Sequence, residues 1–210
     1  MNKRLILSVI TAICFLTSCK NNTKTVEDTP SSPIAINNID NEMMKAMDTM
    51  MAKINAITIT HDFDIDYANM MIAHHQGAID MALIEVEKGT DQKIKIMAQS
   101  IITTQTDEQA KLKEILKKAK SAQIKSKENH PELQNAMKRM MDKMKEMSLT
   151  GQTDKDFVIL MIPHHQGAVE MSRSLPFHGK NRALKQLAQK ISTDQTKNVK
   201  EFKNWLSANK

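Results

Sequence analysis

The sequence predicts an all-α protein assembled from two copies of one unit. Apolar residues recur at intervals of three and four, and no segment alternates apolar and polar residues as a strand would. The pattern repeats without a gap, so that Met47 and Gln105 correspond to Met137 and Gln195, 90 positions later. Because each copy leaves an apolar face uncovered until it meets the other, we expect one antiparallel four-helix bundle with additional Met-rich helices.

The first residues have the pattern of an exported lipoprotein. A basic flank and a short apolar run end at Ser18-Cys19, which resembles a bacterial lipoprotein signal peptide and its lipidation motif. We therefore assign residues 1–18 to a signal peptide and Cys19 to lipidation. Lys20 stands where some bacterial sorting rules look for Asp, which favours a lipid-anchored protein of the cell envelope, on the outer membrane facing the periplasm.

Composition excludes several functions. Cys14 would leave with the signal peptide and Cys19 would hold lipid, so no thiol remains for disulfides, thiolate metal sites or nucleophilic catalysis. Removing Lys3 and Arg4 from the 30 basic residues leaves 28 against 24 acidic residues, a net charge near +4. That small excess does not indicate nucleic acid binding. Metal chemistry in this chain has to use His, Met and carboxylate groups.

The remaining chain divides by composition. Residues 19–40 are polar and nearly free of apolar side chains, as in a flexible tether. The two copies cover residues 41–118 and 131–208. Residues 119–130, rich in Lys, Ser and Gln, join them as a linker or continue the preceding helix.

Each copy is expected to contain three helices: a Met-rich helix, a helix with a His pair, and an amphipathic closing helix. Asp64 and Asp154 are suited to cap the amino termini of the two His helices. Gly89 should end the first His helix, whereas Pro176 should cut the second one short. Pro163 lies inside the second His helix and should bend it. We expect the Met-rich helices to pack against an end or a side of the bundle.

The strongest functional signal is the repeated His pair. Met71 to Met81 reads MIAHHQGAIDM, and Met161 to Met171 reads MIPHHQGAVEM. On a helix, both histidines of each copy fall on the apolar side, where imidazole and thioether groups suit soft and borderline metal ions. A buried histidine can also be a hydrogen-bonded core residue, but retention in both copies favours ligands. The candidate metal ligands are His74, His75, Met71, Met81, His164, His165, Met161 and Met171.

The Met-rich helices offer a second set of thioethers. Their methionines are spaced by three and four, so they form one stripe on each helix. Such a stripe can serve as core packing or as exchangeable positions for a soft ion, and both interpretations stay open. The auxiliary candidates are Met43, Met47, Met50, Met137, Met140 and Met144.

These motifs resemble the family known as domain of unknown function 305. Its hallmark is an aspartate, an aromatic residue, Met-Ile-x-His-His-x-Gly-Ala-[Ile/Val]-x-Met, and a Gln on a later helix. Asp66-Tyr67 and Asp156-Phe157 precede the two motifs, and Gln105 and Gln195 follow them. The resemblance implies a ferritin-like four-helix bundle and, for some relatives, periplasmic binding of copper or silver.

We therefore expect a non-enzymatic lipoprotein that binds copper, sequesters it, or hands it on to a partner protein. Thioethers favour Cu(I), with Ag(I) similar and Zn(II) weaker, while imidazole could also hold Cu(II). A di-iron enzyme would need a Glu-x-x-His motif, and the sequence has none. A haem protein with His and Met axial ligands stays open, as does a structural module whose histidines bond to Gln105, Gln195 or backbone carbonyls.

Overall fold

The computed structural model describes residues 41–119 and 130–209, and this part of the chain contains six α-helices and no strand. The predicted all-α class is therefore confirmed. The expected signal peptide (1–18), the expected tether (19–40) and residues 120–129 of the expected linker lie outside the described residues. The helices are α1 (Glu42–Asn55), α2 (Phe63–Lys88), α3 (Gln92–Ala119), α4 (Pro131–Lys145), α5 (Thr153–His178) and α6 (Arg182–Ala208).

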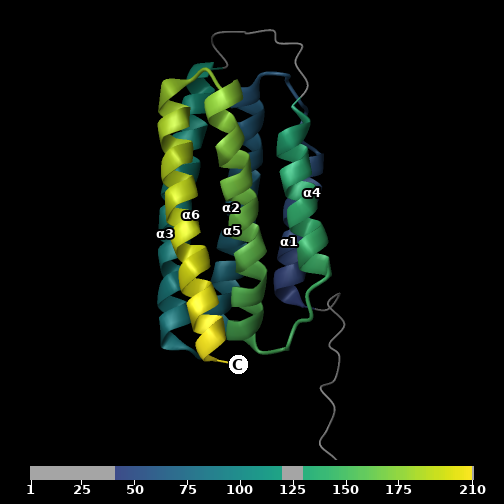
Figure 1. The fold of residues 1–210 in the computed structure, drawn as a ribbon, viewed down its shortest axis with the longest axis vertical. Coiled ribbons are helices and arrows are strands. Elements are labelled where there is room, and N and C mark those ends of the chain that lie inside the picture. Colours follow the sequence, from purple (N-terminus) through teal and green to yellow (C-terminus); the bar gives the residue numbers. More distant parts are fainter. Residues whose placement is uncertain (1–40, 120–129, 210) are drawn as a thin grey trace, which may run out of the picture. The chain divides into compact units, whose positions relative to one another are not determined.

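The helices pack in three layers (Figure 1). The His helices α2 and α5 contact each other in the middle layer. The closing helices α3 and α6 cover one side of that layer, and the Met-rich helices α1 and α4 cover the other. The Met-rich helices thus pack against a side of the bundle. Covered on both sides, α2 and α5 bury residues around much of their circumference, as central helices do.

The helices of the two copies match in position and length. The His helices α2 and α5 both contain 26 residues and begin 90 positions apart, at Phe63 and Thr153. The closing helices contain 28 and 27 residues, and the Met-rich helices 14 and 15. This correspondence agrees with a duplicated unit.

Side-chain hydrogen bonds show that α2 and α5 run antiparallel. Near the start of α2, the Tyr67 hydroxyl lies 2.9 Å from the Ser172 hydroxyl near the end of α5. His74 lies opposite His164 further along the same pair of helices. The closing helices are also antiparallel, because Trp205 near the end of α6 donates to Asp91, which precedes α3.

The prediction that Asp64 and Asp154 cap their own helices is wrong. Asp62 caps α2 by accepting from the Ile65 N–H at 3.2 Å, and α5 starts after Gln152 without a side-chain cap. One carboxylate oxygen of Asp64 instead accepts two backbone N–H groups, from Lys180 and Asn181 at the junction of α5 and α6.

Asp154, in the second copy, makes the equivalent contact to the first copy. Its carboxylate accepts the N–H groups of Thr90 and Asp91, between α2 and α3, at 2.9 and 2.8 Å. Each copy therefore satisfies backbone donors at a helix junction of the other copy. The antiparallel pairing explains this exchange, because it brings the first turn of each His helix beside the end of its partner.

The prediction that Pro176 shortens the second His helix is also wrong. Helix α5 continues through Pro163 and Pro176 to His178, and it ends at Gly179, whose N–H bonds to the Leu175 carbonyl at 2.8 Å. A proline removes one N–H from the helical ladder, but the buried face of α5 keeps the last turn in place. The expected end at Gly89 agrees with α2.

Two glycines let the Met-rich helices approach the His helices closely. A Cβ atom added at Gly77 would lie 2.7 Å from the Met50 sulfur, and one added at Gly167 would lie 3.1 Å from the Met140 sulfur. Both distances are shorter than ordinary carbon–sulfur contacts. The glycines of the two motifs therefore serve helix packing, and they bring one thioether of each copy next to a His helix.

Candidate metal centre

His74 and His164 meet at the centre of the bundle. Their ring centroids lie 3.8 Å apart, and His74 Nε2 lies 3.1 Å from the backbone carbonyl oxygen of His164. The two histidines of one helix are further apart, at 6.3 Å for His74 and His75 and 6.0 Å for His164 and His165. The structure thus pairs imidazoles across the two copies, while neighbours on one helix point in different directions.

Several ring nitrogens of this cluster are buried without a hydrogen-bond partner. A carbonyl oxygen only accepts, so His74 Nε2 carries the proton of the neutral ring and Nδ1 keeps a free electron pair. His74 Nδ1, His165 Nδ1 and both ring nitrogens of His75 and of His164 have no hydrogen-bond partner in the described part of the chain. Leaving such groups unpaired in a core is unfavourable, and a bound ion is one way to satisfy them.

One polar residue of each closing helix contacts His75 or His165, the second histidine of each pair. His75 Nε2 lies 3.1 Å from a Glu108 carboxylate oxygen, and His165 Nε2 lies 3.3 Å from the Asn198 amide nitrogen. Glu108 is buried and also pairs with Lys190 at 3.2 Å. A carboxylate this close to one ring nitrogen helps to orient the imidazole for metal binding through the other nitrogen.

Sequence reasoning missed Glu108 and Asn198, although a signal for them exists. Glu108 is buried and Asn198 is half-buried, each lies three positions after Gln105 or Gln195, and the two correspond at the repeat offset. A polar residue beside the buried face in both copies points to a buried polar partner, here a histidine.

Burial keeps His74, His164 and His165 neutral. It lowers the pKa of His74 and of His164 well below the usual histidine value, with neighbouring histidines adding to the effect. It lowers the pKa of His165 to about 3, with His75 contributing less. At neutral pH these imidazoles are therefore unprotonated, the form in which imidazole binds metal ions.

The four methionines of the motifs are all fully buried on the same helices. Met71 and Met161 precede their paired histidines by three residues, about 4.5 Å along the helix axis. Met81 and Met171 follow by seven residues, about 10 Å along the axis. Met71 and Met161 therefore lie nearer to the level of the paired histidines than the other two.

The auxiliary methionines lie on α1 and α4 and face the middle layer. All six are buried in the core, and the thioethers of Met50 and Met140 reach the His helices at Gly77 and Gly167, one turn after the paired histidines. The six are Met43, Met47, Met50, Met137, Met140 and Met144.

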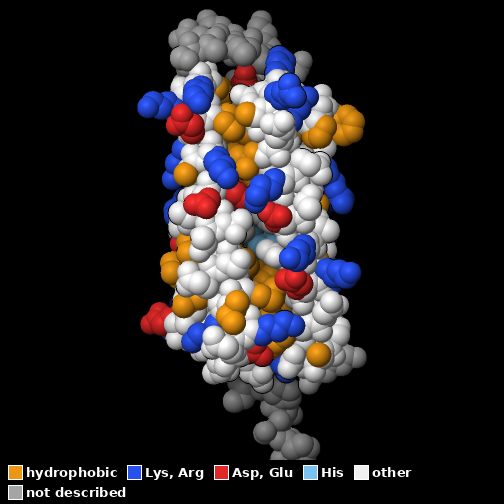
Figure 2. Space-filling model, turned by 90° about the vertical axis from the view of Figure 1, so that its left-hand side faces the viewer, with side chains coloured by type: hydrophobic (Ala, Val, Ile, Leu, Met, Phe, Trp, Pro, Cys, Tyr) orange, Lys and Arg blue, Asp and Glu red, His pale blue; other side chains and the backbone are white. Residues whose placement is uncertain are grey.

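A small hollow leads from solvent toward the histidines. It lies between α3 and α6, has a volume of about 160 Å³, and is lined by residues that include Glu108 and Asn198. Figure 2 shows this face of the bundle, with histidine colour at the base of a small opening near its middle. The groups that touch His75 and His165 thus also line this hollow.

A second group of metal-binding side chains lies away from this centre. His130, Glu132 and His178 come together where α4 begins and α5 ends, and sequence reasoning did not single them out. The predicted lipidation site, Cys19, lies outside the described residues. Within the described residues, no helix is both long and apolar enough to cross a bilayer.

The fold and this centre define a duplicated helical bundle with a buried imidazole cluster shared by the two copies. The chain belongs to the family described as domain of unknown function (DUF305), whose model matches residues 16–116 and 64–206. Comparison with curated proteins found no match.

Several solved structures resemble this bundle. CopM in the Cu(I)-bound form is 26% identical, with a TM-score of 0.54 over 69% of this chain and 96% of that chain. CopM in the Cu(II)-bound form is 27% identical, with a TM-score of 0.55 over 70% and 97%, and CopM has also been solved with bound Ag. A DUF305 protein from Streptomyces coelicolor shares the fold at 22% identity, with a TM-score of 0.56 over 71% of this chain and 95% of that chain.

Proposed function

We propose that this protein binds copper in the core of its bundle, between α2 and α5. The observation that supports this most strongly is the set of buried, neutral imidazoles of His74, His164 and His165, each of which has at least one ring nitrogen without a protein partner. The likeness to CopM, solved with Cu(I), Cu(II) and Ag, supports the choice of ion.

The donor set favours Cu(I) over other ions. Imidazole and thioether are the soft and borderline donors of this core, and the described helices contain no cysteine. His74 and His164 are proposed as the principal ligands, with Met71 and Met161 as the nearer thioethers. His75, positioned by Glu108, and His165 provide further nitrogens, and Met81 and Met171 provide further sulfurs. Imidazole ligands would also accept Cu(II), and thioethers would accept Ag(I).

The cellular role we propose is sequestration or transfer of copper rather than catalysis. A site without thiolate can bind Cu(I) and still release it to a stronger acceptor, such as a copper-trafficking partner protein. Lipidation at Cys19 would anchor the domain to the envelope, on the outer membrane facing the periplasm. A ferritin-like arrangement of the four long helices is part of the same proposal.

The alternative in which the histidines have a purely structural role explains only part of the contacts in the cluster. His74 does bond to a backbone carbonyl, as a purely structural histidine would. Gln105 and Gln195, which that alternative would use as partners, both have buried amide atoms without a hydrogen bond. The histidines therefore keep more free nitrogens than a structural core would be expected to tolerate.

Anaerobic competition of the purified protein with a Cu(I) chelator of known affinity tests the proposal. We expect at least one tightly held Cu(I) per chain that Zn(II) at equal concentration does not displace, and no absorption band of haem in the protein as purified. Failure to compete with the chelator, or displacement of Cu(I) by Zn(II), would refute a soft-metal centre.

A further inference from the structure

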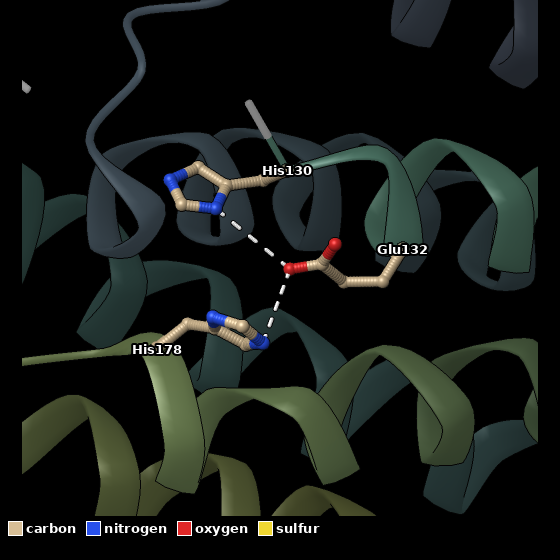
Figure 3. A group of neighbouring side chains, drawn as sticks. All are labelled: His130, Glu132 and His178. Carbon is tan, nitrogen blue, oxygen red and sulfur yellow. Dashed lines mark ion pairs between the residues drawn. The ribbon is translucent and has the colours of Figure 1, made fainter. Parts of the chain in front are cut away.

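Three side chains with metal-binding groups meet at one end of the bundle, as Figure 3 shows. His130 Nδ1 lies 3.7 Å from Glu132 Oε1, and His178 Nε2 lies 3.4 Å from the same oxygen. All three atoms lie within 4.8 Å of one another. Ligands of a tetrahedral zinc ion, bound at 2.0 to 2.1 Å, lie about 3.3 Å apart. The two distances to the carboxylate are close to that spacing, and a small rotation of the rings would close the third.

An aromatic ring from the other copy supports both imidazoles. Phe63, the first residue of α2, stacks on His178 with ring centroids 5.0 Å apart and planes inclined by 25°. It meets His130 edge-on at 4.8 Å, and Phe63 and His130 are both buried. The packing therefore holds the two rings near the carboxylate before any ligand binds and leaves only a small adjustment for coordination.

The equivalent positions in the first copy carry side chains that do not form a metal site. Glu132 corresponds to Glu42 and His178 to Lys88, each at the repeat offset of 90. Glu42 and Lys88 form an ordinary exposed ion pair at 2.5 Å. The lysine cannot coordinate a metal ion while it is charged, whereas histidine at that position can. The second copy thus replaces an ion pair with two imidazoles and a carboxylate.

We propose that His130, Glu132 and His178 form a second metal site, for a borderline divalent cation of the Zn²⁺ class. Two imidazoles and one carboxylate are a known zinc donor set, and they lack the thioethers that favour Cu(I). The His178 side chain is 43% exposed and that of Glu132 is 31% exposed, so one side stays open for water to complete the coordination. The site is independent of the central imidazole cluster.

Calorimetric titration with Zn²⁺ tests this site. We expect the protein to bind one Zn²⁺ at this end, and Glu132→Gln to weaken that binding by about 100-fold or more, since even supporting residues of metal sites contribute 10- to 100-fold. His178→Lys should do the same while restoring the ion pair that the first copy uses, so the bundle should still fold. Glu42→Gln is the matched control in the first copy and should leave Zn²⁺ binding unchanged.

A second measurement separates this site from the core. In the His74→Leu/His164→Leu variant, Zn²⁺ should still bind at the end of the bundle. Zn²⁺ should therefore raise the unfolding temperature of that variant, whereas it should not raise the unfolding temperature of His178→Lys. The site is refuted if the wild-type protein does not bind Zn²⁺, if Glu132→Gln and His178→Lys bind it normally, or if binding disappears in the core variant. None of these outcomes depends on whether the core binds copper.

Discussion

The imidazole rings of His74 and His164 lie 3.8 Å apart at the crossing of α2 and α5, although 90 positions separate them in the chain. Neither copy alone can form this pair. The duplication therefore creates a site that a single unit lacks, because the two helices run antiparallel and place equivalent residues opposite each other. The antiparallel pairing of the two copies and the proposed copper site have the same structural origin.

A histidine without partners should contribute little to folding. Both ring nitrogens of His164 are unpaired, so His164→Leu should leave the free energy of unfolding of the metal-free protein unchanged or raise it by about 1 kcal/mol. His75→Leu should lower it by about 1–3 kcal/mol, because it removes the imidazole that lies 3.1 Å from the buried Glu108 carboxylate. Urea unfolding of both variants checks this. Equal losses in the two would contradict the difference in pairing.

Acid should destabilise the metal-free protein from near pH 6.5 downward. Burial lowers the folded-state pKa of His74, His164 and His165, so the unfolded chain binds more protons below the unfolded-state value of about 6.5. Stability present above that pH is lost as the pH falls, and for His165 the loss continues to about pH 3. Each histidine contributes a slope of about 1.4 kcal/mol per pH unit. Urea unfolding between pH 7.5 and 5 measures it, and His164→Leu should have a shallower slope.

The Met-rich helices should affect copper capacity more than the tight site. Replacing their methionines with leucine nearly conserves volume, so each change should cost less than about 1.5 kcal/mol of stability. Weakly held copper per chain should fall while the chelator-competed affinity stays the same. Metal analysis after equilibrium dialysis measures both quantities, and loss of the tight site would reverse the ligand assignment. The set is Met43, Met47, Met50, Met140 and Met144.

The exchanged aspartate contacts should tie the two copies together. Asp64→Ala removes the acceptor for two N–H groups of the second copy, and Asp154→Ala does the same for the first. By analogy with helix caps, each should lower the free energy of unfolding by about 1–2 kcal/mol. Burial raises the pKa of Asp154, but hydrogen bonds from Asp91 and Thr90 outweigh it and hold the pKa below its usual value. Calorimetry should show one transition at a lower temperature, and a separate early transition of one copy would contradict this coupling.

The periodicity of the sequence predicted the helices and the burial of the histidines well, because both depend on local spacing. It could not decide whether His74 would meet His164 or His75 would meet His165, since that choice depends on the angle and register at which α2 and α5 cross. The register is set by side chains far apart in the chain, such as Tyr67 and Ser172.

Residues whose role depends on the partner copy were harder to predict. Asp64 suits an N-cap in its own sequence context, but the antiparallel pairing gives it unpaired N–H groups at Lys180 and Asn181 instead. Similarly, His130 and His178 are 48 positions apart. They come together only because the start of α4 lies beside the end of α5. The sequence alone contains no signal for such contacts beyond the residue types.

The Cu(I) affinity of His74→Leu, His164→Leu and the double variant tests the central claim most directly. If one ion is shared by the two imidazoles, each single change should lower the chelator-competed affinity nearly as much as the double change, because a lone imidazole leaves the ion under-coordinated. If both single variants retain the affinity of the wild-type protein, or if the two losses simply add, copper does not bridge the two copies at this pair.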